Sequence, residues 1–174
     1  MVAAEISPET IPLVDQNGKR FTLQELRGNG ILISFVYTYC NMSRMCPLTV
    51  SLNKQLREEL SHQKGLDLTQ LFVTLDPAVD TPDVLKAFAE KRGLSSSDYM
   101  LATGTKENIA DFVSSFGAAG VPGEEGVIMH TPMTVLLDSK LKLVHRYLGN
   151  NWSPEDVIKD IVKIKGSETS KGLR

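Results

Sequence analysis

The chain has 174 residues, enough for one domain with a full hydrophobic core. Its 19 basic and 21 acidic residues give a formal charge of -2, which offers no electrostatic surface for nucleic acid. No apolar run reaches the roughly 20 residues that a membrane helix needs. The amino terminus lacks the charged and apolar regions of a leader peptide, so we expect a cytosolic protein or one whose leader or anchor lies outside this sequence.

The two ends of the chain are polar and show no apolar periodicity. Residues 1–10 and 166–174 are therefore expected to be flexible, and residues 11–165 to form a single domain. No internal repeat or low-complexity segment divides this domain.

The first half of the domain predicts a hairpin, a buried strand and a helix. An Asn17-Gly18 turn between two short segments indicates the hairpin. A nearly continuous apolar run indicates a strand buried on both faces. Leucines at every fourth position after Pro47 indicate a helix. The predicted ranges are 11–14 and 19–22 for the hairpin, 31–37 for the strand and 47–63 for the helix.

The second half continues the alternation of strands and helices. Thr81 and Pro82 suit the cap and the first position of one helix, and Thr105 caps the next. A glycine-rich segment indicates a flexible loop, and Ser153 and Pro154 open the last helix. The predicted strands are 71–75, 99–102, and the paired strands 134–137 and 141–147. The predicted helices are 82–92, 105–116 and a final helix from 154, and the predicted loop is 117–128.

This order, β-β-β-α-β-α-β-α-β-β-α, predicts an α/β fold with a central mixed sheet flanked by helices on both faces. The thioredoxin fold has the same order at its core, where βαβ is followed by ββα. We therefore predict a thioredoxin-like fold with an N-terminal β-hairpin and an inserted βα unit as its additions.

The candidate chemistry centres on the only two cysteines, Cys40 and Cys46. If Pro47 is the first helical residue, Cys46 is the N-cap, where free amides and the helix dipole favour a thiolate. Arg44 adds a positive charge nearby. Two residues six apart in one helix lie about 9 Å apart along its axis. Cys40 must therefore lie on a loop that folds back, where the pair can form a disulfide or bind a metal.

A third candidate, His130, lies far away in the sequence. In the thioredoxin fold the loop before this strand faces the cysteine turn and holds a cis-proline, and Pro132 has the matching register. Two thiolates and one imidazole suit Cu(I), or Zn(II) with an added water. A hydrogen-bonded structural role for His130 is the alternative. Asp76 orients His130 or a loop, or simply forms an Asp-Pro turn, while His62 and His145 are expected at the surface.

Taken together, these residues resemble the Sco/SenC family of thioredoxin-like copper proteins over about residues 11–165. The matching segments are Phe35 to Cys40, Cys46-Pro47, Asp76-Pro77 with Asp80-Thr81-Pro82, and His130. The family places three residues between its cysteines, whereas this chain has five. By this resemblance, Cys40, Cys46 and His130 bind copper.

The resemblance also implies an activity and a location. The activity is delivery of copper to, or thiol reduction in, the binuclear copper centre of a respiratory oxidase. The implied partner is an oxidase subunit or another thioredoxin-like protein. Family members are commonly tethered to a membrane, which implies a domain facing the periplasm with its leader or anchor outside this sequence.

Two functions without a metal remain open alternatives. In a thiol-disulfide oxidoreductase, Cys46 would attack a disulfide and Cys40 would resolve it, although such enzymes normally carry Cys-x-x-Cys. In a peroxidase of the peroxiredoxin kind, a reactive cysteine also precedes a proline at a helix start. Those enzymes have threonine three residues before that cysteine, where this chain has Ser43.

Overall fold

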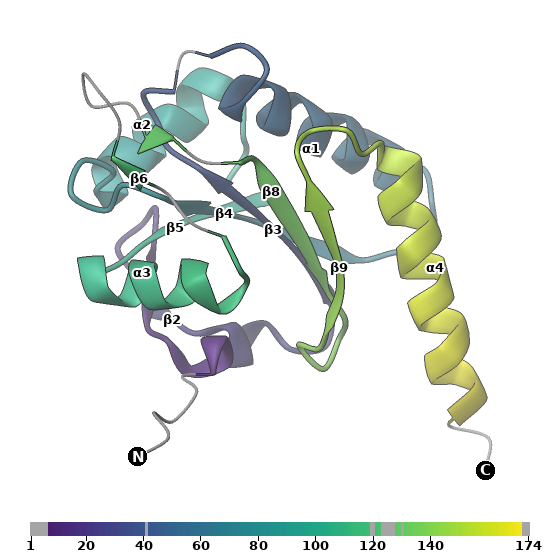
Figure 1. The fold of residues 1–174 in the computed structure, drawn as a ribbon. Coiled ribbons are helices and arrows are strands. Elements are labelled where there is room, and N and C mark those ends of the chain that lie inside the picture. The colour runs from purple at the N-terminus through teal and green to yellow at the C-terminus, as the bar shows by residue number, and fades with distance from the viewer. Residues whose placement is uncertain (1–6, 41, 119–120, 123–127, 130, 172–174) are drawn as a thin grey trace.

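The computed structural model describes residues 7–40, 42–118, 121–122, 128–129 and 131–171 (Figure 1). The strands of this part are β1 (Leu13–Asp15), β2 (Arg20–Phe21), β3 (Gly30–Val36), β4 (Leu68–Thr74), β5 (Tyr99–Thr103), β6 (Val121–Pro122), β7 (Ile128–Met129), β8 (Met133–Leu137) and β9 (Leu143–Leu148). The helices are α1 (Cys46–Ser61), α2 (Pro82–Arg92), α3 (Lys106–Ser115) and α4 (Pro154–Lys171), with two short 3-10 helices, η1 (Pro8–Thr10) and η2 (Leu23–Leu26).

A seven-stranded mixed sheet forms the centre, in the order β2-β1-β5-β4-β3-β8-β9. Strands β3, β4 and β5 are parallel to one another. Strand β8 is antiparallel to β3, and β9 is antiparallel to β8. The βαβ and ββα halves of a thioredoxin-like fold thus meet along β3 and β8, and the predicted fold class is confirmed.

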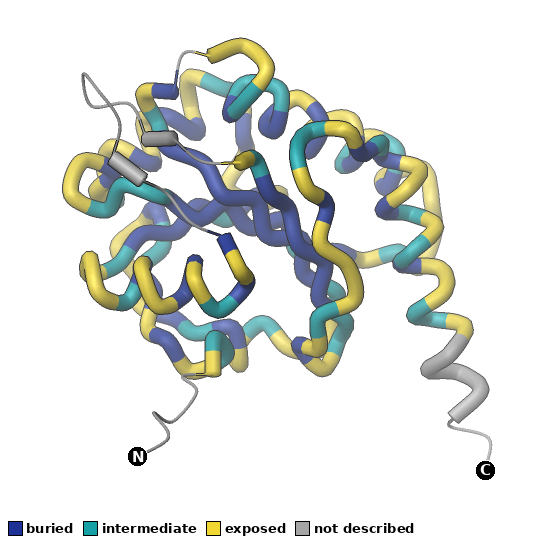
Figure 2. Tube along the Cα trace, viewed as in Figure 1, coloured by how far each residue is buried: buried dark blue, intermediate teal, exposed yellow. Residues whose placement is uncertain are grey.

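Helices cover both faces of the sheet, so β3 is buried on both sides (Figures 1 and 2). Ile31, Ile33 and Phe35 share a cluster with the apolar side chains of α3. Leu32 points to the opposite face, where α1 and α4 pack. The continuous apolar run in the sequence follows from this two-sided burial.

The predicted N-terminal hairpin is present as β1 and β2. One carboxylate oxygen of Asp15 accepts hydrogen bonds from the amides of Asn17 and Lys19, at 2.8 and 2.9 Å. Gly18 has a φ of 80°, a left-handed conformation that glycine adopts without strain. These contacts close the turn that joins the two strands.

The structure differs from the sequence prediction at three places. Within the segment 117–128, predicted as a flexible loop, β6 forms and pairs with β7. The prediction of a loop is therefore wrong at these strands. Helix α4 continues to Lys171, past the predicted domain end, because no proline interrupts it. The short helix η1 forms before residue 11. None of the described helices combines the length and apolar character needed to cross a membrane.

Candidate metal and thiol site

The two cysteines lie at the junction between β3 and α1. Cys40 follows the end of β3 by four residues, and its amide donates to the carbonyl of Tyr37 at 3.4 Å. Cys46 is the first residue of α1. Both cysteines are free thiols, with 3% and 2% of their surface exposed, and they belong to the same buried apolar cluster. The loop between them therefore folds back as predicted.

The start of α1 is shifted by one residue from the prediction. Met45, not Cys46, is the N-cap, and Pro47 is the second helical residue. The cysteine itself thus belongs to the first turn. The prediction of Cys46 as N-cap is wrong by this one position, because the loop before the helix tightens into a turn in which the Met45 amide donates to the Met42 carbonyl at 2.9 Å.

Burial raises the pKa of the Cys46 thiol, and the neighbouring Cys40 adds to that rise. The backbone amides of Tyr37 and Cys46 oppose it without reversing it. The predicted thiolate of low pKa is therefore wrong for the reduced, metal-free pair. Both cysteines belong to a buried apolar cluster whose other members are Val36, Tyr37, Val50, Phe72, Leu85, Phe88, Ala89, Leu94, Tyr99 and Leu101.

Asp80 is a functional residue to which the sequence analysis assigned no role. It is fully buried, and it accepts hydrogen bonds from the Thr38 amide at 3.1 Å and from the hydroxyls of Thr38 and Thr74 at 2.5 Å. Burial raises the pKa of its carboxyl, and these hydrogen bonds oppose that rise. Thr38 lies two residues before Cys40, so Asp80 ties the entry of the cysteine loop to β4. The sequence signal that could have indicated this role is the position of Asp80 in the motif Asp76-Pro77 with Asp80-Thr81-Pro82.

Asp76 lies beside the same loop. Its carboxylate accepts a hydrogen bond from the hydroxyl of Tyr39, and its amide donates to the Thr74 hydroxyl at 2.9 Å. The ring of Tyr39 packs edge-on against Tyr37 at 4.8 Å between centroids. Asp76 was expected to orient His130 or a loop, or to form an Asp-Pro turn. The hydrogen bond from Tyr39 concerns the second of these roles, the orientation of the cysteine loop.

Pro132 directly precedes β8, the strand that pairs with β3. The expected cis peptide bond at Pro132 is wrong, since no peptide bond in the described part of the chain is cis. The carbonyl of Pro132 accepts a hydrogen bond from the Gly149 amide at 2.6 Å. This contact, rather than a cis bond, ties the segment to its neighbour. His130 lies outside the described residues.

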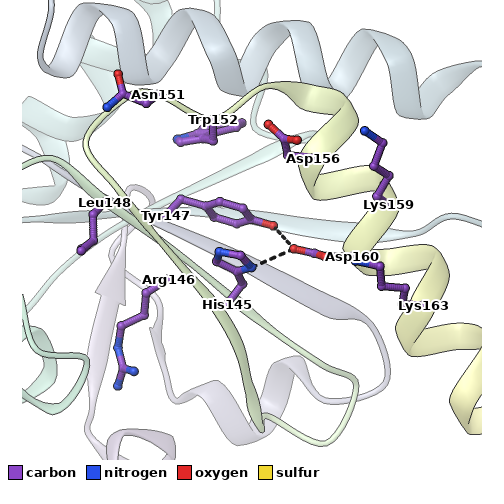
Figure 3. A pocket seen from close by; sticks show the side chains of 10 residues that line it. All are labelled: His145, Arg146, Tyr147, Leu148, Asn151, Trp152, Asp156, Lys159, Asp160 and Lys163. Carbon is purple, nitrogen blue, oxygen red and sulfur yellow. Dashed lines mark hydrogen bonds and ion pairs between the residues drawn. The ribbon is translucent and has the colours of Figure 1, made fainter.

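The two histidines that the structure does describe lie away from the cysteines. His62 is the C-cap of α1, at the opposite end of that helix from Cys46. His145 forms an ion pair with Asp160 at 3.0 Å in a pocket of about 370 Å³ between β9 and α4 (Figure 3). In that pocket its ring stacks on Tyr147 at 4.3 Å. Both residues reach the surface, as predicted.

Among the described residues, no group of three His, Cys, Asp or Glu side chains is placed to hold a metal. Cys40 and Cys46 supply two soft sulfur donors in one buried cluster, which suit a soft ion such as Cu(I) and equally suit a disulfide. Burial disfavours the Cys46 thiolate that both a peroxidase and a disulfide-exchange protein require, so it does not separate these two metal-free functions.

A thioredoxin fold with two buried thiols in one cluster where a central strand meets the following helix defines this chain as a thioredoxin-like cysteine-pair protein. The sequence model of the SCO1/SenC family matches residues 8–166. The chain therefore belongs to the SCO1/SenC family, thioredoxin-like copper proteins of cytochrome oxidase assembly.

Individual relatives agree with this assignment. The SCO2-like protein RT0576 of Rickettsia typhi is 34% identical over 148 residues, which are 80% of this chain and 70% of that protein. A SCO1/SenC family lipoprotein of Bacillus anthracis superposes with a TM-score of 0.79 at 27% identity, covering 93% of this chain and 96% of its own. Yeast Sco1 with copper bound superposes with a TM-score of 0.74 at 26% identity, covering 90% and 87%.

Proposed function

We propose that this chain binds copper through Cys40, Cys46 and His130 and serves the assembly of a respiratory copper centre. The observation that carries the proposal is the placement of two buried, free cysteines in one apolar cluster at the start of α1. Two thiolates and an imidazole form a soft ligand set that suits Cu(I). The similarity to copper-bound yeast Sco1 supports copper as the ion.

The burial of the thiols bears on how the ion would be held. Copper binds thiolates, so its binding displaces the thiol protons and is favoured as the pH rises. The surrounding apolar side chains exclude water from the sulfurs. Because burial raises the pKa of Cys46, a bound ion would have to displace the proton of this thiol.

The position of β8 supports His130 as the third ligand. Thr134 lies opposite Ser34 in the antiparallel pairing of β8 with β3. Because the two strands are antiparallel, the residues just before Thr134, Met133 and Pro132, lie toward the end of β3 that leads to Cys40. In the sequence, His130 precedes Pro132 by two residues.

The partner and location follow from the same proposal. The acceptor of copper, or of reducing equivalents, would be a copper-binding subunit of a respiratory oxidase or another thioredoxin-like protein. A SCO1/SenC relative in Bacillus anthracis is a lipoprotein, which supports a membrane-tethered domain on the periplasmic face for this chain.

Titration of the reduced protein with Cu(I) against a competing chelator tests the copper site. We expect binding tighter than micromolar in the wild type, loss of binding in Cys40→Ser and Cys46→Ser, and an affinity at least about tenfold weaker in His130→Ala. His62→Ala, at the far end of α1, serves as the matched control and should bind as the wild type does. Micromolar or weaker binding, or an unchanged affinity in His130→Ala, would overturn the proposal.

The placement of the two free thiols in one cluster also favours a second function, thiol-disulfide exchange without a metal. Cys46 would attack a partner's disulfide and release one partner thiolate, forming a mixed disulfide. Cys40 would then attack Cys46 and release the second thiolate, which leaves the partner reduced and this chain with a Cys40–Cys46 disulfide. Insulin reduction by dithiothreitol, accelerated by the wild type but by neither serine variant, is the expected result. Equal rates in all three proteins would rule it out.

A further inference from the structure

The turn formed by Gly149 and Asn150, between β9 and α4, contacts both segments of the candidate site. The side-chain amide of Asn150 donates to the carbonyls of Arg44 and Met45, both at 3.1 Å. The backbone amide of Gly149 donates to the carbonyl of Pro132 at 2.6 Å. One turn thus holds the end of the cysteine loop and the segment that follows His130.

The contact with Asn150 is made at the residue that directly precedes Cys46. Thr81 and Thr105 cap α2 and α3 with their side chains, whereas the N-cap of α1, Met45, makes no such hydrogen bond. The Met45 carbonyl accepts the first helical hydrogen bond of α1 from the Thr49 amide at 3.0 Å, and the Thr49 hydroxyl and the Asn150 amide also donate to it, at 3.2 and 3.1 Å. Cys46 is the next residue.

The orientation of the Asn150 amide is itself determined. The hydroxyl of Thr49, a buried residue of α1, donates to the Asn150 side-chain oxygen at 3.0 Å. With its oxygen occupied by this donor, the nitrogen of Asn150 faces the two carbonyls. Asn150 is thus bonded to both sides of the Cys46 position, at residues 44–45 and at residue 49.

The backbone of the turn requires a glycine. Gly149 has a φ of 70°, and a Cβ added there would lie 3.2 Å from the side-chain nitrogen, Nδ2, of Asn151. This left-handed conformation allows the Gly149 amide to face Pro132 while Asn150 reaches the cysteine loop.

We propose that Asn150 is a positioning residue that sets the Cys46 sulfur against Cys40 and against the segment carrying His130. The proposal rests on the copper-binding function in naming His130 as a ligand, but the placement of Cys46 also governs metal-free thiol chemistry. Loss of the Asn150 contacts frees the end of the cysteine loop from the turn that also holds Pro132. Copper affinity and the equilibrium between thiols and disulfide should then change together.

The test uses Asn150→Asp with Asn151→Asp as its matched control. Aspartate at 150 keeps the shape and the acceptor for Thr49 but replaces the donor to two carbonyls by a negative oxygen. The control places the same charge one residue away, on an exposed side chain. Thr49→Val removes the hydroxyl that contacts both the Asn150 oxygen and the Met45 carbonyl, and it keeps the proposal testable if Asn150→Asp fails to fold.

Two readouts are compared in each reduced, full-length protein: Cu(I) affinity by chelator competition, and the equilibrium constant for Cys40–Cys46 disulfide formation in a glutathione buffer. We expect Asn150→Asp to change both by about tenfold or more, Thr49→Val to change both by a smaller factor in the same direction, and Asn151→Asp to match the wild type. Equal constants in Asn150→Asp and Asn151→Asp would overturn the positioning role. If the wild type fails to bind Cu(I), the proposed copper function falls, and the disulfide equilibrium still decides the role of Asn150.

Discussion

Asp80 accepts hydrogen bonds from both the backbone amide and the hydroxyl of Thr38, two residues before Cys40. The contact crosses from the start of α2 to the end of β3 and is fully buried on the Asp80 side. It makes the second aspartate of the Asp-Pro motif a support of the cysteine loop.

Asp80→Ala should lower the free energy of unfolding by about 1–3 kcal/mol at neutral pH, because three donors lose their acceptor. Urea denaturation measures this change. Asp111→Ala, on the exposed side of α3, is the control and should change the value by less than about 0.5 kcal/mol. If Asp80→Ala were as stable as this control, the buried carboxyl would not contribute to the free energy of unfolding.

The same carboxyl predicts a pH dependence. Burial places the pKa of Asp80 above that of an unfolded aspartate, about 3.9, so the folded state binds this proton more tightly. The contribution of Asp80 to stability therefore rises as the pH falls from neutral toward about 4. We expect the gap in unfolding free energy between the wild type and Asp80→Ala to widen over this range. A gap that narrows would contradict the direction of the shift.

Asp76→Asn and Tyr39→Phe should each weaken Cu(I) binding by less than about tenfold. Tyr39→Phe removes the hydrogen bond from the Tyr39 hydroxyl to Asp76, and Asp76→Asn leaves only a neutral oxygen to accept it; Tyr39 is 41% exposed, so the bond contributes little. Chelator competition measures both variants. A much larger loss in Asp76→Asn alone would show that Asp76 acts on the ion or on His130 rather than on the loop.

The reduced, metal-free protein should be alkylated slowly at Cys46. Burial raises the pKa of this thiol, so the thiolate fraction at neutral pH is smaller than in a free cysteine, whose pKa is about 8.5. The rate of reaction with iodoacetamide, measured against pH in Cys40→Ser, should rise only above that value. A midpoint below about 7.5 would restore the reactive thiolate that the sequence suggested.

In the pocket beside β9, the hydrogen bond from Tyr147 to Asp160 allows a test of how one residue sets the pKa of the other (Figure 3). Partial burial alone would raise the pKa of Asp160, but the hydrogen bonds from Tyr147 and Lys163 and the nearby charges lower it. Tyr147→Phe removes a donor at 2.8 Å and should raise that pKa, as followed by carboxyl NMR titration. Because a depressed pKa stabilises the fold above the unfolded value, the variant should lose less stability in acid than the wild type. Tyr39→Phe, remote from Asp160, should leave the titration unchanged.

The fold was predictable because its local signals agree with its tertiary structure. The two-faced burial of β3 produces an apolar run, and the Thr81 and Thr105 caps mark the starts of α2 and α3. Helix α1 lacks such a signal, since its N-cap is Met45 and its support comes from Asn150, on a distant part of the chain. Its start was therefore misplaced by one residue.

The positions of the two cysteines were predictable, but their electrostatics were not. Spacing and the proline predict Cys40 and Cys46 near the start of α1, where the structure has both in one buried cluster, while their role in metal binding stays a prediction. The direction of the Cys46 pKa was wrong because burial by Leu85 and Phe72, from α2 and β4, outweighs the helix terminus. Periodicity within one segment does not show which side chains from other segments will cover a loop.

X-ray absorption at the copper edge of the Cu(I)-loaded protein tests the central claim most directly, because it counts the neighbours of the ion by element. The account predicts two sulfur neighbours and one nitrogen neighbour in the wild type, with the nitrogen lost in His130→Ala and retained in His62→Ala. A spectrum with fewer than two sulfur neighbours, or one that is the same in the wild type and His130→Ala, would contradict it.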